Sequence, residues 1–305
     1  MSNEFLALEI GGTKLQLVVG DEAQKVIERK KLAVEPARGA VGIREQIELE
    51  LPGLLKGRKL AGVGVGFGGP VDWRTGSVAR SHQIAGWSGF DLKDWLQGLA
   101  QARAVVDNDA NVAALGEALH GAGRGFNPVF YVTLGSGVGG GLISNGAIYH
   151  GATPGEAEVG HLRLDRMGTT LESRCSGWAV DRRIRELKVS HPTSALCTMI
   201  GPAAGGEAKY LAPALARGDA AAKKLLSDLA EDLAYGLSHV VHLFHPEIII
   251  LGGGLSGVGE PLRAAVARAL PSFVMDVFQP GPRVALSELA EDAVPVGGLA
   301  LAAGA

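Results

Sequence analysis

Residues 6–21 read LALEIGGTKLQLVVGD, two apolar runs on either side of a polar glycine turn. Each run predicts a β-strand, and the turn adds a hydroxyl group on Thr13 and a cation on Lys14. Gly11 and Gly12 allow the backbone to come close to a bound group, and this combination suits a phosphate. A tight hairpin with a polar tip is the alternative interpretation of the same residues.

The composition is that of a globular protein. The chain has 305 residues, of which 47% are hydrophobic and 20% charged, and its net charge is −3. This length accommodates two domains with separate cores. The sequence shows no basic stripe for nucleic acid, no apolar run long enough to cross a membrane and no signal peptide. With only two cysteines, a disulfide framework is not expected, and we predict a soluble, cytoplasmic protein.

The order of the expected elements divides the chain into two halves. Each half opens with two strands around a glycine turn, which predicts an α/β fold of two domains that face each other across a ligand cleft. We expect the boundary near residue 118. In the first half, strands are expected at 5–10, 15–19, 25–32, 61–66 and 104–106, and helices at 41–55, 92–99 and 110–120. In the second half, strands are expected at 129–134, 140–143 and 248–251, and helices at 220–242 and 260–269.

Two further glycine clusters lie in the second half. Residues 134–143, LGSGVGGGLI, formally contain G-x-G-x-x-G, but a strand is expected next, where a dinucleotide fingerprint requires a helix. We interpret this turn, with its hydroxyl on Ser136, as a phosphate cradle of another type or as a flexible hairpin. Residues 246–260, PEIIILGGGLSGVGE, predict a strand, a glycine turn and a helix start, which serve either close approach to a ligand or strand–helix packing.

Three polar residues, Asp107, Asn108 and Asp109, follow the strand at 104–106. One of them could simply cap the next helix. A helix cap requires only one side chain, however, and a carboxylate at the end of a strand can accept the proton of a substrate hydroxyl. The sequence therefore offers a general base here, with capping alone as the alternative.

A second group of polar residues lies in the stretch GATPGEAEVGHLRLD, residues 151–165. Glu158 and His161 stand there among glycines rather than on a regular helix face. Carboxylate and imidazole groups match the donors and acceptors of sugar hydroxyls. Structural zinc is not expected at His161 because no C-x-x-C pair accompanies it.

Taken together, these motifs resemble the ROK family of the sugar kinase, heat-shock protein and actin superfamily, which includes glucokinases and sugar-responsive repressors. The resemblance is carried, in this order, by EIGGTK, GFGGPVD, DNDANVAALGE, TLGSGVGGGLI, AEVGH, LES, HPEIIILGGGLS and VGGLALA. It implies a two-domain actin-like ATPase (ribonuclease H-like) fold with a cleft between the domains. The smaller domain would comprise residues 1–118 and a C-terminal helix at about 293–305, and the larger one residues 119–292.

The resemblance also implies the role of each matching position. Asp109 is expected to act as the base on a hexose hydroxyl, and Glu9 to help place Mg²⁺ through water. The positions implied for hexose binding are Gly69, Asn108, Asp109, Glu158, His161 and Glu172. Those implied for ATP binding are Gly11, Gly12, Thr13, Lys14, Ser136, Gly137, Gly253 and Gly254.

The sequence departs from the family pattern at two places. The family usually has Asp where Glu9 stands; the extra methylene moves the carboxylate, and Mg²⁺ demands near-ideal geometry. In addition, most members place a C-x-C-G-x-x-G-C zinc motif where this chain has LRLDRMGTTL, residues 162–171. We therefore predict no structural zinc. We expect Cys175 on a helix continuing through 173–187, and apolar side chains to hold the loop, namely Leu162, Leu164, Met167 and Leu171.

The expected function is ATP- and Mg²⁺-dependent phosphorylation of a hexose, at C6 as in glucokinases, by a protein that the resemblance implies is a homodimer. A catalytically weak sugar- or nucleotide-binding homologue is the alternative, because of Glu9 and the missing zinc motif. A DNA-binding regulator is not expected, since those members carry an N-terminal winged helix and the first strand here is predicted from Phe5. Polyphosphate is a less favoured donor because no basic groove is evident.

Overall fold

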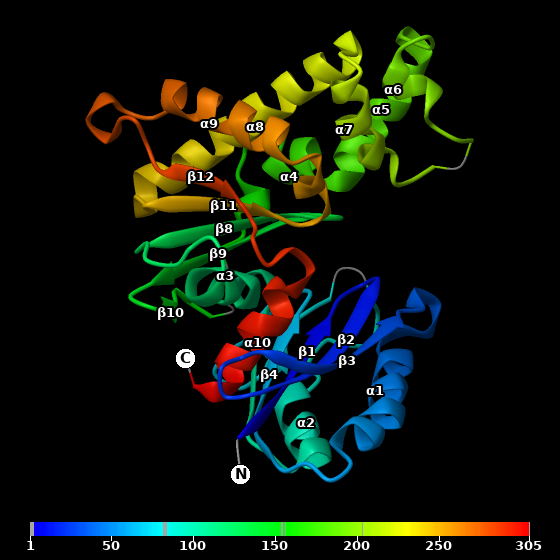
Figure 1. Ribbon diagram of the computed structural model, residues 1–305, viewed down its shortest axis with the longest axis vertical. Helices are drawn as coiled ribbons and strands as arrows, with labels where there is room; N and C mark the ends of the chain where they lie inside the picture. The colour runs from blue at the N-terminus through cyan, green and yellow to red at the C-terminus, as the bar shows by residue number, and fades with distance from the viewer. Residues whose placement is uncertain (1–2, 82–83, 154, 156, 203, 305) are drawn as a thin grey trace. The chain divides into compact units, whose positions relative to one another are not determined.

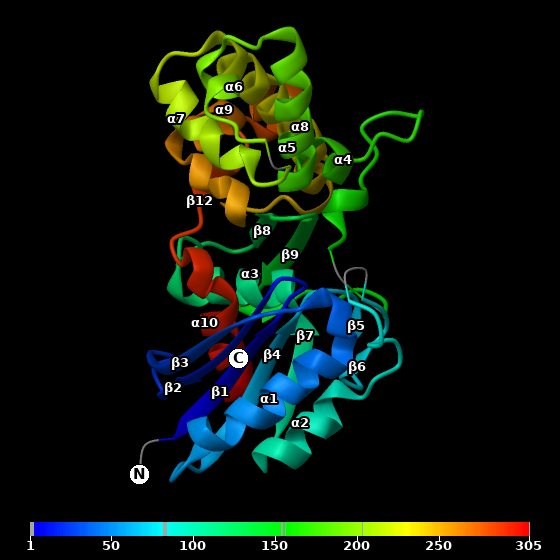
Figure 2. The same cartoon turned by 90° about the vertical axis from the view of Figure 1, so that its right-hand side faces the viewer.

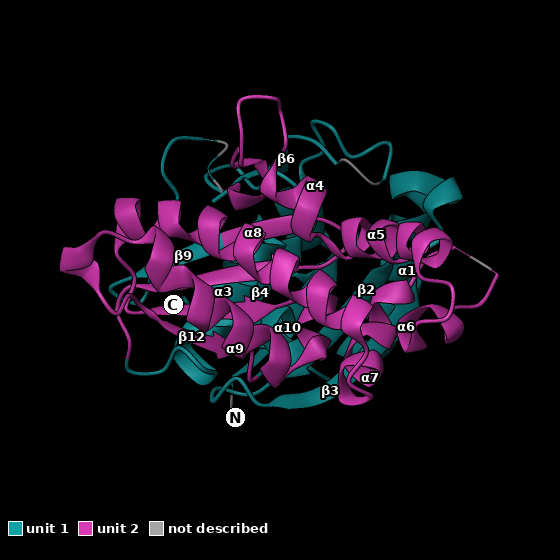
Figure 3. Cartoon of the chain, turned by 90° about the horizontal axis from the view of Figure 1, so that it is seen from above, with its two compact units in different colours: residues 1–125, 141–157, 289–305 teal, residues 126–140, 158–288 magenta. Residues whose placement is uncertain are grey.

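The computed structural model describes residues 3–81, 84–153, 155, 157–202 and 204–304 (Figure 1). The chain divides into two units, coloured separately in Figure 3. Unit 1 comprises residues 1–125, 141–157 and 289–305, and unit 2 comprises residues 126–140 and 158–288. Within the described ranges, no helix has both the length and the apolar character required to cross a membrane.

The sheet of unit 1 has five strands in the order β3-β2-β1-β4-β7. β1, β2 and β3 form an antiparallel meander, whereas β4 is parallel to both β1 and β7. Ile10 pairs with Phe67, and Phe67 with Asn108, so the carboxyl ends of the three parallel strands are level. The strands are β1 (Glu4–Ile10), β2 (Lys14–Gly20), β3 (Val26–Ala33), β4 (Leu60–Phe67) and β7 (Ala104–Asn108).

Helices cover this sheet on both faces because β1 is apolar on both. Leu6, Leu8 and Ile10 join the core beneath α1 (Gly39–Leu55) and α2 (Leu92–Ala100), which lie on one face in Figure 2. Phe5 and Ala7 point the other way and pack against Leu299 of α10 (Ala293–Ala303). This division follows the two-residue repeat of a strand. The short strands β5 (Val71–Asp72) and β6 (Ser77–Val78) form a separate hairpin in the same unit.

The last helix, α10, is in close contact with α3 (Asp109–His120). A Cβ built on Gly297 would lie 1.8 Å from the carbonyl oxygen of Val112, so only glycine fits there. The buried carboxylate of Glu117 accepts hydrogen bonds from the backbone of Ala122 and of Leu289, each at 2.9 Å. Residues from both ends of the chain therefore complete the core of unit 1.

The second sheet has the order β10-β9-β8-β11-β12. β11 is parallel to its neighbours β8 and β12, and Ile248 to Leu251 are fully buried, as is typical of a central parallel strand. Residues of β9 from Gly141 onward, and all of β10, belong to the segment assigned to unit 1. The strands are β8 (Val129–Leu134), β9 (Val138–Ser144), β10 (Ala147–Ile148), β11 (Ile248–Gly252) and β12 (Arg283–Leu286).

The remaining helices belong to unit 2. The long helix α8 packs beside α9 over the strands of this unit (Figure 1). The α-helices are α4 (Leu171–Cys175), α5 (Gly177–Ser190), α6 (Ala195–Thr198), α7 (Leu211–Ala216), α8 (Ala220–Phe244) and α9 (Glu260–Ala269). Short 3₁₀ turns across the chain are η1 (Pro36–Arg38), η2 (Val159–His161), η3 (Glu207–Tyr210), η4 (Gly254–Val258), η5 (Leu270–Phe273), η6 (Asp276–Phe278) and η7 (Ala290–Asp292).

One expected helix is wrong. The pattern predicts a continuous helix over 173–187, but α4 ends at Cys175 and α5 begins at Gly177. Ser176 between them has extended dihedral angles, and its hydroxyl accepts a hydrogen bond from the backbone of Ala179. The serine thus acts as the N-cap of a new helix. The chain turns at a point where the sequence pattern favours one continuous helix.

Candidate active-site residues

Three segments of unit 1 that are predicted to carry site residues meet where β1, β4 and β7 end. The carboxyl ends of these strands lie side by side. The glycine turn is closed by a hydrogen bond from the Gly11 amide to the Lys14 carbonyl at 2.9 Å, and Gly68 donates to the Ile10 carbonyl at 2.8 Å. A Cβ on Gly68 would lie 3.3 Å from the Cα of Gly11 and 3.4 Å from Oδ2 of Asp109. The turn expected to bind phosphate and the carboxylate expected to act as base therefore both approach the same side of Gly68.

Asn108, not Asp109, caps helix α3. Its Oδ1 accepts a hydrogen bond from the backbone of Ala110 at 2.8 Å, and its Nδ2 donates to the carbonyl of Gly69 at 3.3 Å. Asp109 is the first residue of the helix and is half-buried. Since the cap is already supplied, capping does not account for the carboxylate of Asp109. The structure also brings together Asn108 and Gly69, both expected at the hexose.

Glu9 lies beside the same turn, with both carboxylate oxygens engaged. Oε1 forms an ion pair with Nζ of Lys14 at 2.9 Å, and Oε2 accepts a hydrogen bond from Nε2 of Gln16 at 2.6 Å. Gln16 is fully buried and pairs with Glu9 across β1 and β2, so a neighbouring strand of the sheet holds this carboxylate in place. A carboxylate held in this way fits water-mediated contact with Mg²⁺ carried by ATP, rather than direct coordination in a protein cage.

In unit 2, the Ser136–Gly137 turn joins β8 to β9 and meets Glu172. Oε2 of Glu172 accepts a hydrogen bond from the Val138 amide at 2.9 Å, and a Cβ on Gly137 would lie 2.5 Å from that oxygen. Glu172 is expected at the hexose, whereas the turn is expected at the ATP phosphates. The carboxylate thus supports the backbone of the turn that is expected to bind phosphate.

Glu158 precedes the 3₁₀ turn η2 and His161 is its last residue, and both are exposed. Gly160 within it packs so closely on β9 that a Cβ there would lie 2.1 Å from the Val138 carbonyl oxygen. Val138 therefore contacts both η2, through its carbonyl, and Glu172, through its amide. Three of the residues expected at the hexose are thereby connected to one strand of unit 2.

Gly253 and Gly254 begin the turn η4 directly after β11. Gly253 has φ +76°, and its Cβ would lie 2.6 Å from the backbone of Leu134, whereas Gly254 faces open space. Because β11 runs parallel to β8, this turn lies next to the Ser136–Gly137 turn. Both turns expected at ATP in unit 2 therefore lie at the same sheet edge, where ligands of α/β proteins commonly bind.

The loop at 162–171 corrects an expectation. Of the four expected apolar anchors, only Leu171 is buried, and Met167 is 92% exposed. Backbone hydrogen bonds hold the loop instead: Leu164 donates to Thr169 and Leu171 to Leu162, each at 2.9 Å. Asp165 accepts from the amides of Met167 and Thr169 at 2.7 and 3.1 Å. Hydrogen bonds from Thr169, then from Met167 and Gly168, hold the pKa of this carboxyl below its usual value.

We predict that purified, tag-free protein contains well under one zinc ion per chain and that EDTA leaves its melting temperature unchanged. Burial raises the pKa of the Cys175 thiol, which disfavours the thiolate that zinc requires. Among the described residues, no three His, Cys, Asp or Glu side chains are grouped as metal ligands. Elemental analysis and a melting curve with and without EDTA provide the check. Stoichiometric zinc, or a large loss of stability in chelator, would contradict this.

His150 is a residue that the sequence reasoning did not identify. Its Nε2 lies 2.5 Å from Oδ2 of the buried Asp107, and its ring stacks on Trp73. No local pattern links His150 to Asp107, since 43 positions separate them. Only the fold of unit 1 places this histidine beside Asp107, the residue that precedes the Asn108–Asp109 turn.

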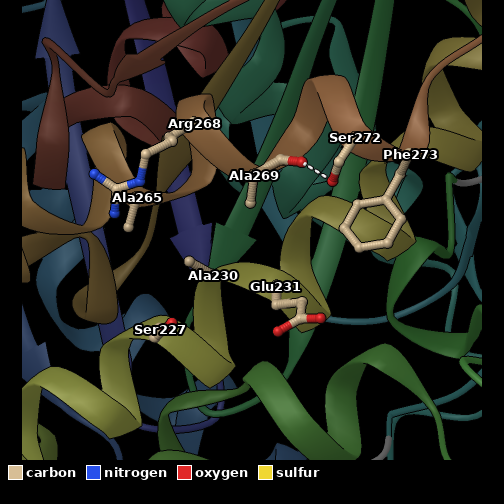
Figure 4. Close-up of a pocket in the computed structure, with 8 residues that line it drawn as sticks. All are labelled: Ser227, Ala230, Glu231, Ala265, Arg268, Ala269, Ser272 and Phe273. Carbon is tan, nitrogen blue, oxygen red and sulfur yellow. Dashed lines mark hydrogen bonds between the residues drawn. The ribbon is translucent and has the colours of Figure 1, made fainter.

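A pocket in unit 2 is lined by other residues. It is formed by α8, α9 and η5, with Arg268 and Phe273 at opposite ends (Figure 4). Its lining consists of Ser227, Ala230, Glu231, Ala265, Arg268, Ala269, Ser272 and Phe273. None of the residues expected to bind hexose or ATP is among them, so we do not assign this pocket to the candidate site.

Comparison with known proteins identifies relatives over nearly the whole chain. The sequence matches the ROK family across residues 5–305. It is 31% identical to a glucokinase of Streptomyces coelicolor over 87% of each chain, and 28% identical to a glucokinase of Halalkalibacterium halodurans over 96% of this chain and 93% of that one. The structure matches a ROK family glucokinase from Streptomyces griseus, solved with glucose and AMPPNP, with 30% identity, a TM-score of 0.86 and 99% coverage of each chain.

These matches confirm the predicted α/β fold of the actin-like ATPase (ribonuclease H-like) type. The match in sequence extends from Phe5 in β1 to the end of the chain, and the structural match covers 99% of the chain. The chain therefore belongs to the ROK family.

Proposed function

We propose that this protein is an ATP-dependent hexose kinase that phosphorylates the C6 hydroxyl of its sugar. The observation that carries the proposal is the position of Asp109: its Oδ2 and the Cα of Gly11 lie 3.4 and 3.3 Å from the place that a Cβ on Gly68 would occupy. The proposed proton acceptor and the proposed phosphate-binding turn are thus close together at one sheet edge. The similarity to glucokinases supports a hexose as acceptor and ATP as donor.

In the proposed reaction, Asp109 accepts the proton of the sugar hydroxyl as its oxygen attacks the γ-phosphorus of ATP. The bond between the γ-phosphorus and the bridging oxygen breaks, and ADP leaves. Backbone amides of the turns at Gly11–Gly12 and Ser136–Gly137 would stabilise charge on the phosphates. Mg²⁺ enters as part of the nucleotide substrate, neutralises phosphate charge, and would contact Glu9 through water.

The remaining hexose positions would orient the ring. Carboxylates accept hydrogen bonds from sugar hydroxyls, while amide and imidazole groups can donate as well. We assign this role to Asn108, Glu158 and His161, and a double role to Glu172. Its second carboxylate oxygen would bind the sugar while Oε2 remains on the Val138 amide. Sugar binding and the shape of the phosphate turn would then be coupled through one side chain.

A coupled assay of ADP release, run against a panel of hexoses and amino sugars, tests the proposed function. We expect one or a few hexoses, with glucose tested first, to raise ADP release far above the sugar-free rate. A reaction without sugar controls for plain ATP hydrolysis. Release that no sugar stimulates would contradict the proposal.

A second candidate, a sugar- or nucleotide-binding homologue with weak catalysis, is favoured by one observation. Both oxygens of Glu9 are already engaged, by Lys14 and by Gln16. A displacement of about 1 Å in a catalytic group can cost on the order of a hundredfold in rate. Calorimetry that finds tight hexose binding without phosphate transfer would support this candidate instead.

We predict that Glu9→Gln lowers kcat by roughly tenfold to a hundredfold and raises the Mg²⁺ concentration required for half-maximal rate. The exchange removes the charge that faces Lys14 and any water on Mg²⁺. Glu9→Asp, which restores the usual family acid, is the matched control and should keep kcat at or above the wild-type value. Initial rates over a Mg²⁺ titration at saturating ATP and hexose provide the measurement. Wild-type Mg²⁺ dependence in Glu9→Gln would rule out this role.

A further inference from the structure

The buried carboxylate of Asp107 holds the turn that carries Asn108 and Asp109. Its Oδ1 accepts two hydrogen bonds, from the Asn108 amide at 2.7 Å and from Nδ2 of Asn111 at 2.9 Å. Asp107 is 2% exposed, and Asn111 is fully buried. The carboxylate thus fixes the end of β7 to the first turn of α3, at the point where the predicted base leaves the strand.

The other oxygen of this carboxylate is held by His150. Nε2 of His150 lies 2.5 Å from Oδ2, and the two side chains are 17% and 3% exposed. His150 follows β10, whose end is fixed by a hydrogen bond from the Tyr149 amide to the Leu142 carbonyl at 2.8 Å. A buried carboxylate oxygen without a hydrogen-bond donor is unfavourable, because it has given up its contacts with water and gained none in return. Asp107 therefore depends on His150 to keep its orientation.

Trp73 fixes the plane of the imidazole. The two rings are stacked, with centroids 4.2 Å apart and planes at 14°. The guanidinium of Arg74 lies 5.3 Å from the centroid of the Trp73 ring. Trp73 follows the loop of Gly69, whose carbonyl accepts a hydrogen bond from Asn108. Contacts therefore link Trp73 to His150, His150 to Asp107 and Asp107 to Asn108. Asn108 in turn bonds to Gly69, which precedes Trp73 by four residues in the chain.

We propose that His150, braced by Trp73, is a positioning residue for Asp109. It acts through Asp107, whose carboxylate accepts a hydrogen bond from the Asn108 backbone. Without this donor, Asp107 rotates, and the Asn108 amide next to the base loses its acceptor. The expected effect of His150 on the reaction rate rests on the proposed kinase function. The expected effect of His150 on the Asn108 backbone does not.

Two substitutions at His150 separate hydrogen bonding from ring packing. His150→Phe keeps a ring to stack on Trp73 but cannot donate, whereas His150→Gln keeps an N–H donor and loses the ring. We expect His150→Phe to lower kcat by about tenfold to a hundredfold with little change in the KM for ATP. His150→Gln should recover most of this loss. His191→Phe, the same exchange at an exposed histidine, should leave both parameters unchanged.

Amide hydrogen exchange at Asn108 provides a readout that does not depend on turnover. We expect exchange to be on the order of tenfold faster in His150→Phe, and close to wild type in His150→Gln. Wild-type kcat and wild-type protection in His150→Phe would overturn the proposal. So would equal losses in both variants, because the effect would then follow the ring rather than the donor. A wild-type protein without phosphoryl transfer, but with the expected exchange pattern, would overturn the proposed function instead.

Discussion

Asp109→Asn is expected to lower kcat by about 10²–10⁴-fold, the range that a general base contributes. The substitution preserves the size of the side chain and its ability to hydrogen-bond a hydroxyl, but asparagine cannot take the proton. Asn108 remains as the cap of α3, so the helix start should be unchanged. Hexose affinity, measured by calorimetry, should therefore stay near the wild-type value while turnover nearly disappears.

Asp94→Asn is a suitable control for this experiment. Asp94 is an exposed acid in the first turn of α2, in the same unit as Asp109, and belongs to none of the predicted positions. It should leave kcat unchanged. If Asp109→Asn turned over as fast as the control, Asp109 would not be the base. If hexose binding vanished as well, the carboxylate would primarily hold the sugar.

Gly297→Ala is expected to lower the free energy of unfolding by about 3 kcal/mol or more, the largest loss of stability among the substitutions proposed. The added methyl group would lie 1.8 Å from the Val112 carbonyl oxygen, well inside any permitted contact. Neither helix can move aside freely, because Gly116 on α3 also faces the backbone of α10 closely: a Cβ there would lie 2.4 Å from the carbonyl oxygen of Ala293. A melting point lower by roughly 6–12 °C follows from the usual ratio of stability to melting temperature.

Gly98→Ala provides the matched control for that substitution. Gly98 lies in helix α2, and a Cβ there would meet no other atom within 4 Å. Alanine is favoured over glycine inside a helix by up to about 1 kcal/mol, so this variant should melt at or slightly above the wild-type temperature. A Gly297→Ala protein that melts within about 2 °C of wild type would show that the contact between α3 and α10 can relax.

Much of the fold follows from local pattern. The strand pairs around the glycine turns, the strand at 248–251 and the long helix from Ala220 were all expected from hydrophobic periodicity, and the structure has them. The same applies to Asp109, because a carboxylate at the end of a strand and the start of a helix is visible in the chain itself. These features depend on residues close in sequence, where strand and helix repeats and turn glycines are informative.

Other features depend on contacts between distant segments. The pairing of His150 with Asp107 joins residues 43 positions apart, and the hydrogen bond from Val138 to Glu172 spans 34 positions. The break at Ser176 depends on one hydroxyl, which accepts a hydrogen bond from the Ala179 amide and so caps a new helix. The loop at 162–171 is held by backbone hydrogen bonds, which cannot be predicted from the hydrophobicity of the side chains. For this reason, the expectation of apolar anchors was wrong there.

Direct identification of the product tests the central claim, that this protein transfers the γ-phosphoryl group of ATP to a hexose. The purified protein is incubated with ATP, Mg²⁺ and the hexose that best stimulates ADP release, and the mixture is analysed by phosphorus-31 NMR with proton coupling. The account predicts one phosphate ester for each ADP formed, coupled to the two protons on C6, and none above background with Asp109→Asn. Inorganic phosphate in place of the ester, or ester formed equally by Asp109→Asn, would contradict it.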